Sequence, residues 1–235
     1  MIIQPIKTRI FQEGENLFAF ITNYFKDIPE KSIIVVTSKI VALAEKRTAV
    51  VKNTQTKEKL IYKESEIAIL TKYVWLTVKD GVAMASAGID ESNANGKLIL
   101  LPRDSFKVAY NLRKKLRKKY QLRHLGVLIV DSRTIPLRAG IVGVSLGYAG
   151  FCGIRDYRGN SDIFGRKFKF SRTNIADGLA SAAVLVMGEG NEQQPIVIIK
   201  KAPAKFCDKI YKNELHIDIK EDIYCPLFSK SLKLK

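Results

Sequence analysis

The segment at residues 125–138, LGVLIVDSRTIPLR, constrains the fold of this chain more than any other. Its apolar run VLIV ends abruptly at Asp131, with a glycine before it and a proline a few positions after it. A continuous apolar run this short, bounded in this way, is typical of a buried strand. An aspartate where such a strand ends lies at an edge of the core, where it still reaches water. We therefore expect the chain to be organised around this strand and its polar end.

Charged and hydroxyl side chains follow the apolar run closely. One carboxylate, two hydroxyls and two guanidiniums fall within eight positions, namely Asp131, Ser132, Arg133, Thr134 and Arg138. This mixture suits a divalent metal ion and the phosphate groups that the metal bridges. A polar turn that merely ends a strand accounts for the same residues equally well. Both interpretations stay open for this segment taken alone.

Length, charge and cysteine content narrow the class of protein. The 235 residues suffice for one large domain or two small lobes. The formal net charge of +17 favours anionic partners such as nucleotides, polyanionic metabolites, nucleic acid or an anionic membrane. The three cysteines are scattered without metal-ligand spacing, which is typical of reduced thiols in a cytoplasmic protein. The longest uncharged run, residues 139–154, is shorter than the roughly 20 residues of a membrane span. With no secretory signal at Met1, we expect a soluble cytoplasmic protein without a membrane partner.

Apolar periodicity predicts strands and helices along most of the chain. Strands are expected at residues 1–6, 33–36 and 195–199, and helices at residues 16–25, from 40 onward, at 57–70, 102–122 and 174–186. Asp80 and Gly81 separate two short apolar segments, which is typical of a tight hairpin turn. Asn174 is a good N-terminal cap for the last helix.

Two further segments carry side chains that suit an anion or a cation. The strand at 33–36 runs through Thr37, Ser38 and Lys39 into a helix, and unpaired backbone N–H groups at such a turn bind anions. A simple Ser/Thr helix cap is the more frequent explanation of that pattern. The loop at residues 87–97 holds oxygen donors of the kind that Mg²⁺ or Mn²⁺ accepts, namely Asp90, Glu91, Asn93 and Asn95. A lone loop of this kind is about twice as often a solvated turn, but with Asp131 it forms a candidate metal site from two distant segments.

Two strongly charged segments also allow more than one interpretation. The helix at 102–122 keeps a four-residue apolar spacing, so one face packs and the basic remainder is solvated. RNA binding is the alternative, but no aromatic platform or known RNA motif accompanies it, so nucleic acid is not the expected partner. Residues 155–166, RDYRGNSDIFGR, form either a clamp for carboxylates or phosphates or a structural salt-bridge network. No nucleophile has an adjacent base.

Five ordered motifs together resemble the gamma-glutamyl ligases of deazaflavin coenzyme F420 biosynthesis. They are VVTSKIVALAE (35–45), SAGIDESN (86–93), IVDS (129–132), RDYRGNSDIFGR (155–166) and NIADGLASAAVLVMGE (174–189). The resemblance covers the chain to about Lys201, which implies a ligase domain at 1–201 of two interleaved lobes and a C-terminal extension at 202–235. It implies a two-lobed α+β fold with a mixed sheet, a homodimer, and the use of GTP or ATP to join a carboxylate to the amine of L-glutamate.

The resemblance also assigns roles to individual residues. It implies Mg²⁺ or Mn²⁺ binding by Asp90, Asp131, Ser132 and Glu189, and nucleotide binding by Ser38, Lys39, Asn93, Met187, Gly188 and Glu189. Asp90, Asp131 and Lys39 would be the catalytic residues. Candidate substrate contacts are the charged residues Arg133, Arg138, Arg155, Asp156, Arg158 and Arg166.

This chain departs from the deazaflavin enzymes in ways that bear on its acceptor. Leu43 stands where they have a lysine, and Glu189 stands where they have a glutamine. The segments RTIPLR, PIKTRIFQEGE and MGEGNEQQP are similar to a subgroup proposed to act in folate metabolism. This likeness favours a pterin or folate acceptor, dihydropteroate or tetrahydrofolate, with the deazaflavin as the alternative. A basic RNA-binding module is the alternative from another class.

Overall fold

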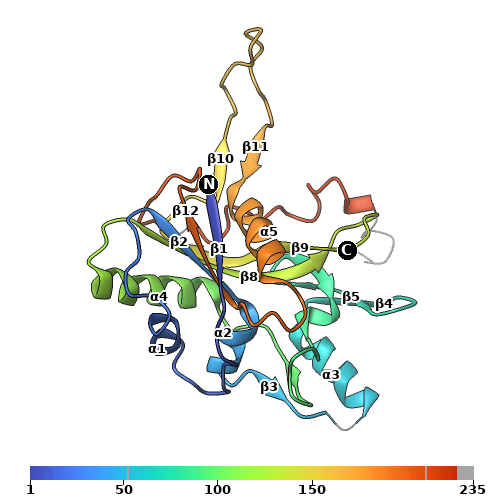
Figure 1. Cartoon of the computed structure of the whole chain (residues 1–235). Helices are drawn as coiled ribbons and strands as arrows, with labels where there is room; N and C mark the ends of the chain where they lie inside the picture. The colour runs from blue at the N-terminus through green and yellow to red at the C-terminus, as the bar shows by residue number, and fades with distance from the viewer. Residues whose placement is uncertain (52, 210, 227–235) are drawn as a thin grey trace. The chain divides into compact units, whose positions relative to one another are not determined.

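The computed structural model describes residues 1–51, 53–209 and 211–226. The chain divides into two compact units (Figure 1). Of the described residues, those within 1–47 and 102–214 make up the first unit, and those within 48–101 and 215–226 make up the second. Residues 202–214 of the expected extension thus belong to the first unit.

A five-stranded mixed sheet forms the centre of the first unit. Its strand order is β1 (Ile2–Ile6), β12 (Ile196–Lys200), β2 (Ser32–Thr37), β8 (Leu125–Thr134) and β9 (Ile141–Ala149). Within this sheet only β2 and β8 pair in parallel, with Thr37 opposite Val130. The other neighbours in the sheet are antiparallel. The carboxyl ends of β2 and β8 therefore meet at one edge of the sheet.

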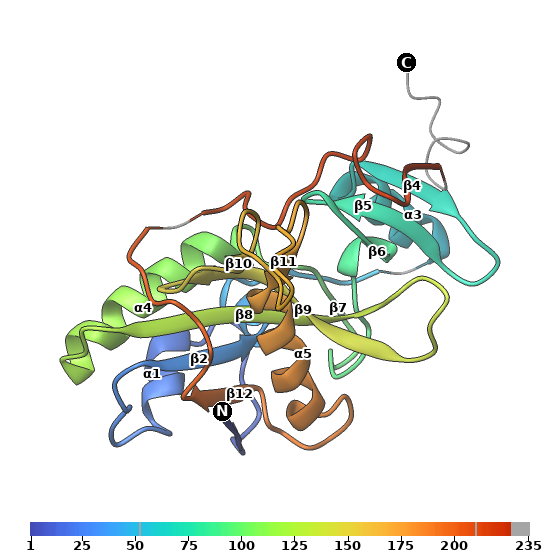
Figure 2. The same cartoon turned by 90° about the horizontal axis from the view of Figure 1, so that it is seen from above.

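Helices cover both faces of this sheet, as the sequence pattern requires (Figures 1 and 2). On one face, α1 (Leu17–Thr22), α2 (Ser38–Ala44) and α4 (Ser105–Tyr120) enclose an apolar cluster that includes Ile34 and Val36 of β2. The alternate residues Ile33 and Val35 are equally buried and point to the other face, where α5 (Ile175–Met187) lies. Burial of each such aliphatic side chain stabilises the folded state by about 1.5–3 kcal/mol relative to leaving it exposed. The continuous apolar runs of β2 and β8 are thus explained by burial on both sides.

A hairpin extends from the first unit between β9 and α5 (Figure 1). Its base is formed by β10 (Ile154–Asp156) and β11 (Arg172–Asn174), which pair antiparallel. We call residues 154–174 the arm. Three large apolar side chains of the arm are almost fully exposed, at 92% for Ile163, 88% for Phe164 and 86% for Phe170.

The second unit includes two small sheets, the helix α3 (Thr54–Glu64) and the short helix η1 (Ser86–Gly88). In one sheet β3 (Thr48–Ala49) pairs with β7 (Leu98–Ile99), and in the other β4 (Ile67–Leu70), β5 (Trp75–Lys79) and β6 (Val82–Ala85) lie in sequence order. Between them run α3 and η1. Asp80 and Gly81 both have positive φ, 51° and 71°, which confirms the predicted tight hairpin turn.

The α+β class expected from the resemblance is confirmed, and three element boundaries are corrected. The predicted helix at 57–70 ends at Glu64, and Ile67–Leu70 form β4 because they pair with β5. The helix predicted at 16–25 ends at Thr22. The strand predicted to break at Asp131 continues to Thr134, because β9 pairs with it throughout, Asp131 lying opposite Val144. No helix among the described residues is long and apolar enough to cross a membrane.

Candidate active site

Polar side chains gather where β2 ends and its parallel pairing with β8 stops. Thr37 is the last residue of β2, and its β8 partner Val130 directly precedes Asp131. In open sheets of this kind, ligands bind outside the carboxyl ends of the strands. Two segments that the sequence singled out separately, 37–39 and 131–133, are therefore brought to the same edge.

Ser38 and Asp131 are joined directly by a hydrogen bond. The Ser38 hydroxyl, in a residue only 6% exposed, donates to Asp131 Oδ1 at 3.1 Å. Thr37, the N-cap of α2, makes no side-chain capping bond, so helix capping does not explain this hydroxyl-rich turn. Lys39 lies half-buried in the first turn of α2, and Leu43 lies one turn later, packed against the core cluster.

Ser132 makes a second contact on the opposite face of β8. Successive side chains of a strand alternate, so Asp131 and Ser132 point to different faces. The Ser132 hydroxyl donates to Glu189 Oε2 at 3.3 Å, just beyond the end of α5 at Met187. Gly188 has φ 75° and ψ 173°, a conformation open almost only to glycine, and it turns the chain so that Glu189 lies beside β8.

Arg133 lies on the same face of β8 as Asp131, two residues further along. It is only 7% exposed, which is unusual for a guanidinium. Arg138 is exposed in the loop that follows β8.

Asp90 and Asn93 belong to the second unit, where the loop is a well-formed turn. The Asp90 carboxylate accepts hydrogen bonds from the Ser92 backbone N–H at 2.7 Å and the Ser92 hydroxyl at 2.9 Å. Asp90 and Ile99 also exchange both backbone hydrogen bonds. Asn93 has the left-handed φ of 53° that asparagine tolerates better than most residues. The convergence of Asp90 with Asp131 stays a prediction, because the two residues lie in different units.

Comparison with known proteins decides the family. The sequence model of the family "F420-0:Gamma-glutamyl ligase" matches residues 5–201, which includes every residue of the candidate site. The chain belongs to this family.

Three curated relatives of this chain illustrate the similarity. A coenzyme F420:L-glutamate ligase of Methanococcus maripaludis strain C7 is 34% identical over 90% of this chain and 91% of its own. The protein of the same name from Archaeoglobus fulgidus is 27% identical over 87% of this chain and 90% of its own. That from Methanopyrus kandleri is 40% identical over 58% of this chain and 54% of its own.

The aspartates of the arm, Asp156 and Asp162, accept hydrogen bonds from other residues of the arm. Asp156 forms an ion pair with Arg158, and its carboxylate also accepts from the Arg158 backbone N–H at 2.9 Å. The hydrogen bond from the Arg158 side chain, and then the one from its backbone N–H, lower the pKa of Asp156 to about 2. Asp162 Oδ1 accepts from the backbone of Arg166 at 2.9 Å. The Arg155 guanidinium donates to the carbonyl oxygen of Pro203. These contacts fit the salt-bridge interpretation, and the substrate role of the arginines stays a prediction.

The metal set predicted for this ligase mixes carboxylates with a hydroxyl. Across residues 1–51, 53–209 and 211–226, no three His, Cys, Asp or Glu side chains gather closely enough to hold a metal ion. Asp131 and Glu189 each accept a hydrogen bond from a serine hydroxyl. Oxygen donors of this hard type nonetheless fit Mg²⁺ or Mn²⁺ in preference to softer metals.

Sequence reasoning missed one residue of this site, Glu192. Its carboxylate accepts from the Gly190 backbone N–H at 2.8 Å and lies against Gly188, bracing the turn that carries Glu189. An acid two residues after a glycine is a common turn pattern, so the sequence offered only a weak signal.

Proposed function

We propose that this chain is a nucleotide-dependent gamma-glutamyl ligase that joins the carboxylate of a deazaflavin acceptor, the F420-0 form, to the amine of L-glutamate. The observation that carries the proposal is the Ser38–Asp131 hydrogen bond. It joins, at the carboxyl end of β2 and beside β8, two motifs that the family match includes.

The reaction class follows from the chemistry of the substrates. A carboxylate is too poor an electrophile for an amine to attack at neutral pH. The γ-phosphoryl group of GTP or ATP therefore passes first to the acceptor carboxylate, giving an acyl phosphate and a nucleoside diphosphate. The glutamate amine then attacks the carbonyl carbon, and inorganic phosphate leaves. No covalent enzyme intermediate is needed, which agrees with a sequence that offers no nucleophile beside a base.

The residues of the site fit this chemistry. Two cations, Mg²⁺ or Mn²⁺, would be held, one by Asp131 on one face of β8 and one by Ser132 with Glu189 on the other. Asp90 is a further ligand that the resemblance implies. Such a cation, when bound, neutralises phosphate charge and aligns the phosphoryl group. Ser38 orients the Asp131 carboxylate through its hydrogen bond. Lys39, with Asn93 and the turn at 187–189, would contact the nucleotide and add positive charge where the transferred phosphoryl group carries negative charge.

The identity of the acceptor rests on the relatives. The three relatives are named coenzyme F420:L-glutamate ligases, which supports the deazaflavin over the pterin or folate that the sequence departures favoured. One observation keeps a pterin or folate as the second candidate. Leu43, which stands in place of the deazaflavin enzymes' lysine, packs into the core cluster, so this position supplies no charge to a ligand.

RNA binding is poorly supported by the contacts of α4. The Arg113 and Arg117 side chains both bond to Asp208, and Arg113 is only 4% exposed. The aromatic ring of Phe18 is approached by the Lys115 and Lys119 ammonium groups at 5.8 and 5.9 Å. A ring in such contacts is a poor stacking platform for a base.

A homodimer forms part of the proposal. The exposed apolar side chains of the arm, Ile163, Phe164 and Phe170, suit burial against a second copy of this chain. Analytical ultracentrifugation of the purified protein tests this, and a monomer at micromolar concentration contradicts it.

The function is tested by incubating the purified chain with labelled glutamate, GTP or ATP, and Mg²⁺ or Mn²⁺. Three acceptors are compared, namely F420-0, dihydropteroate and tetrahydrofolate. The proposal expects glutamate to be coupled fastest to F420-0, with one nucleoside diphosphate released per amide formed. Faster coupling to a pterin or folate overturns the choice of acceptor, and no coupling to any of the three overturns the ligase proposal.

A further inference from the structure

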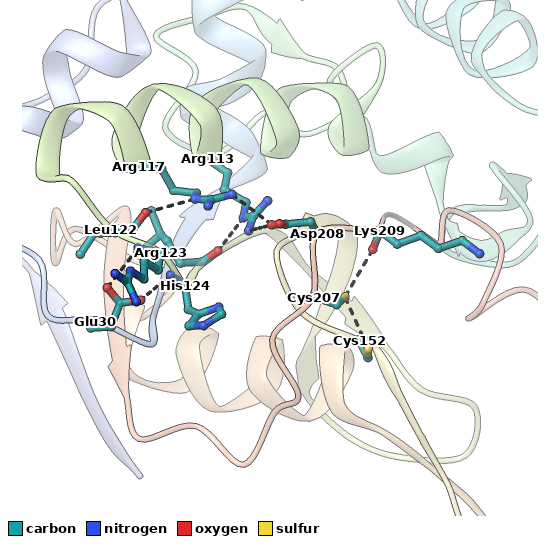
Figure 3. A network of polar contacts seen from close by, with 11 residues as sticks. Glu30, Arg113, Arg117, Leu122, Arg123, His124, Cys152, Cys207, Asp208 and Lys209 are labelled. Atoms are coloured by element: carbon teal, nitrogen blue, oxygen red, sulfur yellow. Dashed lines mark hydrogen bonds and ion pairs between the residues drawn. The ribbon is translucent and has the colours of Figure 1, made fainter.

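Two of the three thiols in this chain lie next to each other. Cys152 Sγ and Cys207 Sγ are 3.4 Å apart although the residues are 55 positions apart in the sequence (Figure 3). Both side chains are partly accessible to solvent. A small reagent can therefore reach the pair, and the two sulfurs must approach from 3.4 Å to the roughly 2.05 Å of a disulfide bond.

The backbone fixes the two cysteines at this separation. Phe151 and Phe206 form an antiparallel bridge, and each cysteine directly follows one of them. The Cys152 N–H donates to the Lys205 carbonyl at 2.9 Å, and the Cys207 N–H donates to the Gly150 carbonyl at 3.1 Å. Since side chains alternate along extended chains, both thiols point to the face opposite the two phenylalanines.

The segment that carries Cys207 is held in place independently of the thiols. Asp208 forms ion pairs with Arg113 and Arg117 (Figure 3). Further along, Glu214 Oε1 accepts from the Tyr148 hydroxyl and from the Gly153 N–H at 2.6 Å. These contacts keep Cys207 beside Cys152 in the reduced protein.

We propose that Cys152 and Cys207 form a reversible disulfide, which makes this pair a redox modification site that accepts low-molecular-weight disulfides such as oxidised glutathione. This inference does not depend on the ligase activity.

The order of the two steps follows from the surroundings of the thiols. Burial first, and then the hydrogen bond with Cys152, raise the pKa of Cys207 to about 11, so Cys207 keeps its proton at neutral pH. The first attack on the external disulfide RSSR therefore falls to the Cys152 sulfur, which lies beside Cys207 and is partly accessible to solvent. The S–S bond of RSSR breaks, one RS⁻ leaves, and Cys152 carries a mixed disulfide.

In the second step Cys207 gives its proton to solvent and its sulfur attacks the Cys152 sulfur. The second RS⁻ leaves as the internal bond forms. The two protein thiols are thereby oxidised to one disulfide, and one RSSR is reduced to two RSH. An excess of RSH reverses both steps.

Closing the bond would tie the C-terminal segment to the base of the arm. Cys152 directly precedes Gly153, whose carbonyl accepts from the Ile175 and Ala176 N–H groups at the start of α5. A cross-link that closes a loop of this length restricts the unfolded chain strongly. We expect the oxidised protein to melt at least about 5 °C higher than the reduced protein.

The test equilibrates the full chain with glutathione buffers of increasing GSSG content. Alkylation and peptide mass mapping then identify the bonded cysteines. The wild-type chain and the C225S variant should both give the 152–207 disulfide with a mass loss of two hydrogens. C207S should instead stop at a glutathione adduct on Cys152. A disulfide that involves Cys225, or stable glutathione adducts on both Cys152 and Cys207 of the wild type, overturns the proposal.

A second measurement uses only the wild-type protein, so its result does not depend on whether the variants fold. Hydrogen exchange of the amides around Cys152 and Cys207 is compared between reduced and oxidised wild-type protein. Slower exchange by about tenfold in the oxidised form supports the cross-link. Equal exchange and equal melting temperatures in the two forms contradict it.

Discussion

The Ser38 hydroxyl donates a hydrogen bond to the Asp131 carboxylate at 3.1 Å, across 93 positions of the sequence. The contact joins the end of β2 to β8 at the only parallel pairing of the five-stranded sheet. Because this carboxylate is central to the proposed chemistry, the bond gives Ser38 a positioning role.

Ser38→Ala should lower kcat/KM for glutamate ligation by about tenfold, because Asp131 loses a donor that fixes its orientation. The free energy of unfolding should fall by roughly 1.5–3 kcal/mol, as for a hydrogen bond to a charged group. Ser181→Ala is the matched control, since its hydroxyl donates to the Gly143 carbonyl at 2.8 Å between α5 and β9. Steady-state kinetics with urea unfolding measure both effects. Equal loss of activity in the two variants contradicts a specific role for Ser38.

Gly188→Ala should destabilise the protein by about 1–3 kcal/mol, because φ 75° with ψ 173° is strained for any residue with a Cβ. Ligation should fall with it, since the turn carries Glu189. Gly178→Ala is the matched control, because Gly178 lies inside α5, just before this turn, and an added Cβ there meets nothing within 4 Å. That variant should be more stable by about 0.5–1 kcal/mol. Thermal unfolding compares them, and a neutral G188A refutes the argument from backbone strain.

Glu189→Gln should retain ligation within a few-fold, because an amide oxygen also accepts from Ser132 and binds a hard cation. Glu189→Ala removes both functions, and its rate should fall by about two orders of magnitude. Initial rates at saturating Mg²⁺ or Mn²⁺ separate the two variants. If E189A matches the wild type, Glu189 has no part in the site.

Asp208 should make stability depend on acid pH. The hydrogen bond from Arg113, followed by the charges of Arg113 and Arg117, lowers the pKa of its carboxyl in the folded protein. A lowered folded pKa means that the stabilisation is complete above the unfolded pKa of about 3.9 and is lost as the pH falls through the folded value. Melting temperatures between pH 5 and 2 should therefore decline more steeply for the wild type than for Asp208→Asn. Parallel declines contradict this assignment.

Much of the fold could be predicted from local pattern. The buried strand at β8 followed from an apolar run too short for a helix, and the hairpin turn followed from Asp80 and Gly81, which tolerate positive φ. The strand β4 was mistaken for helix because IAIL fits either period in so short a segment. Only its pairing with β5, a tertiary contact, decides the conformation.

The residues of the candidate site could be predicted from the sequence, but the hydrogen bonds between them could not. Asp131 and Ser38 were each identified from residue type at a strand end. The bonds that join Ser38 to Asp131 and Ser132 to Glu189 depend on sheet order and on the turn after α5. The adjacency of Cys152 and Cys207 was hidden for the same reason, because their spacing of 55 positions carries no local signal.

Replacement of Asp131 tests the central claim most directly. In Asp131→Asn the new amide keeps an oxygen that accepts from Ser38, so the fold should be retained while the negative charge is lost. This variant should reduce the rate of nucleotide-dependent glutamate coupling by about two or more orders of magnitude, and Asp27→Asn, at an exposed carboxylate away from the site, should leave it unchanged. A D131N protein that folds normally and couples glutamate at the wild-type rate would contradict the proposed active site.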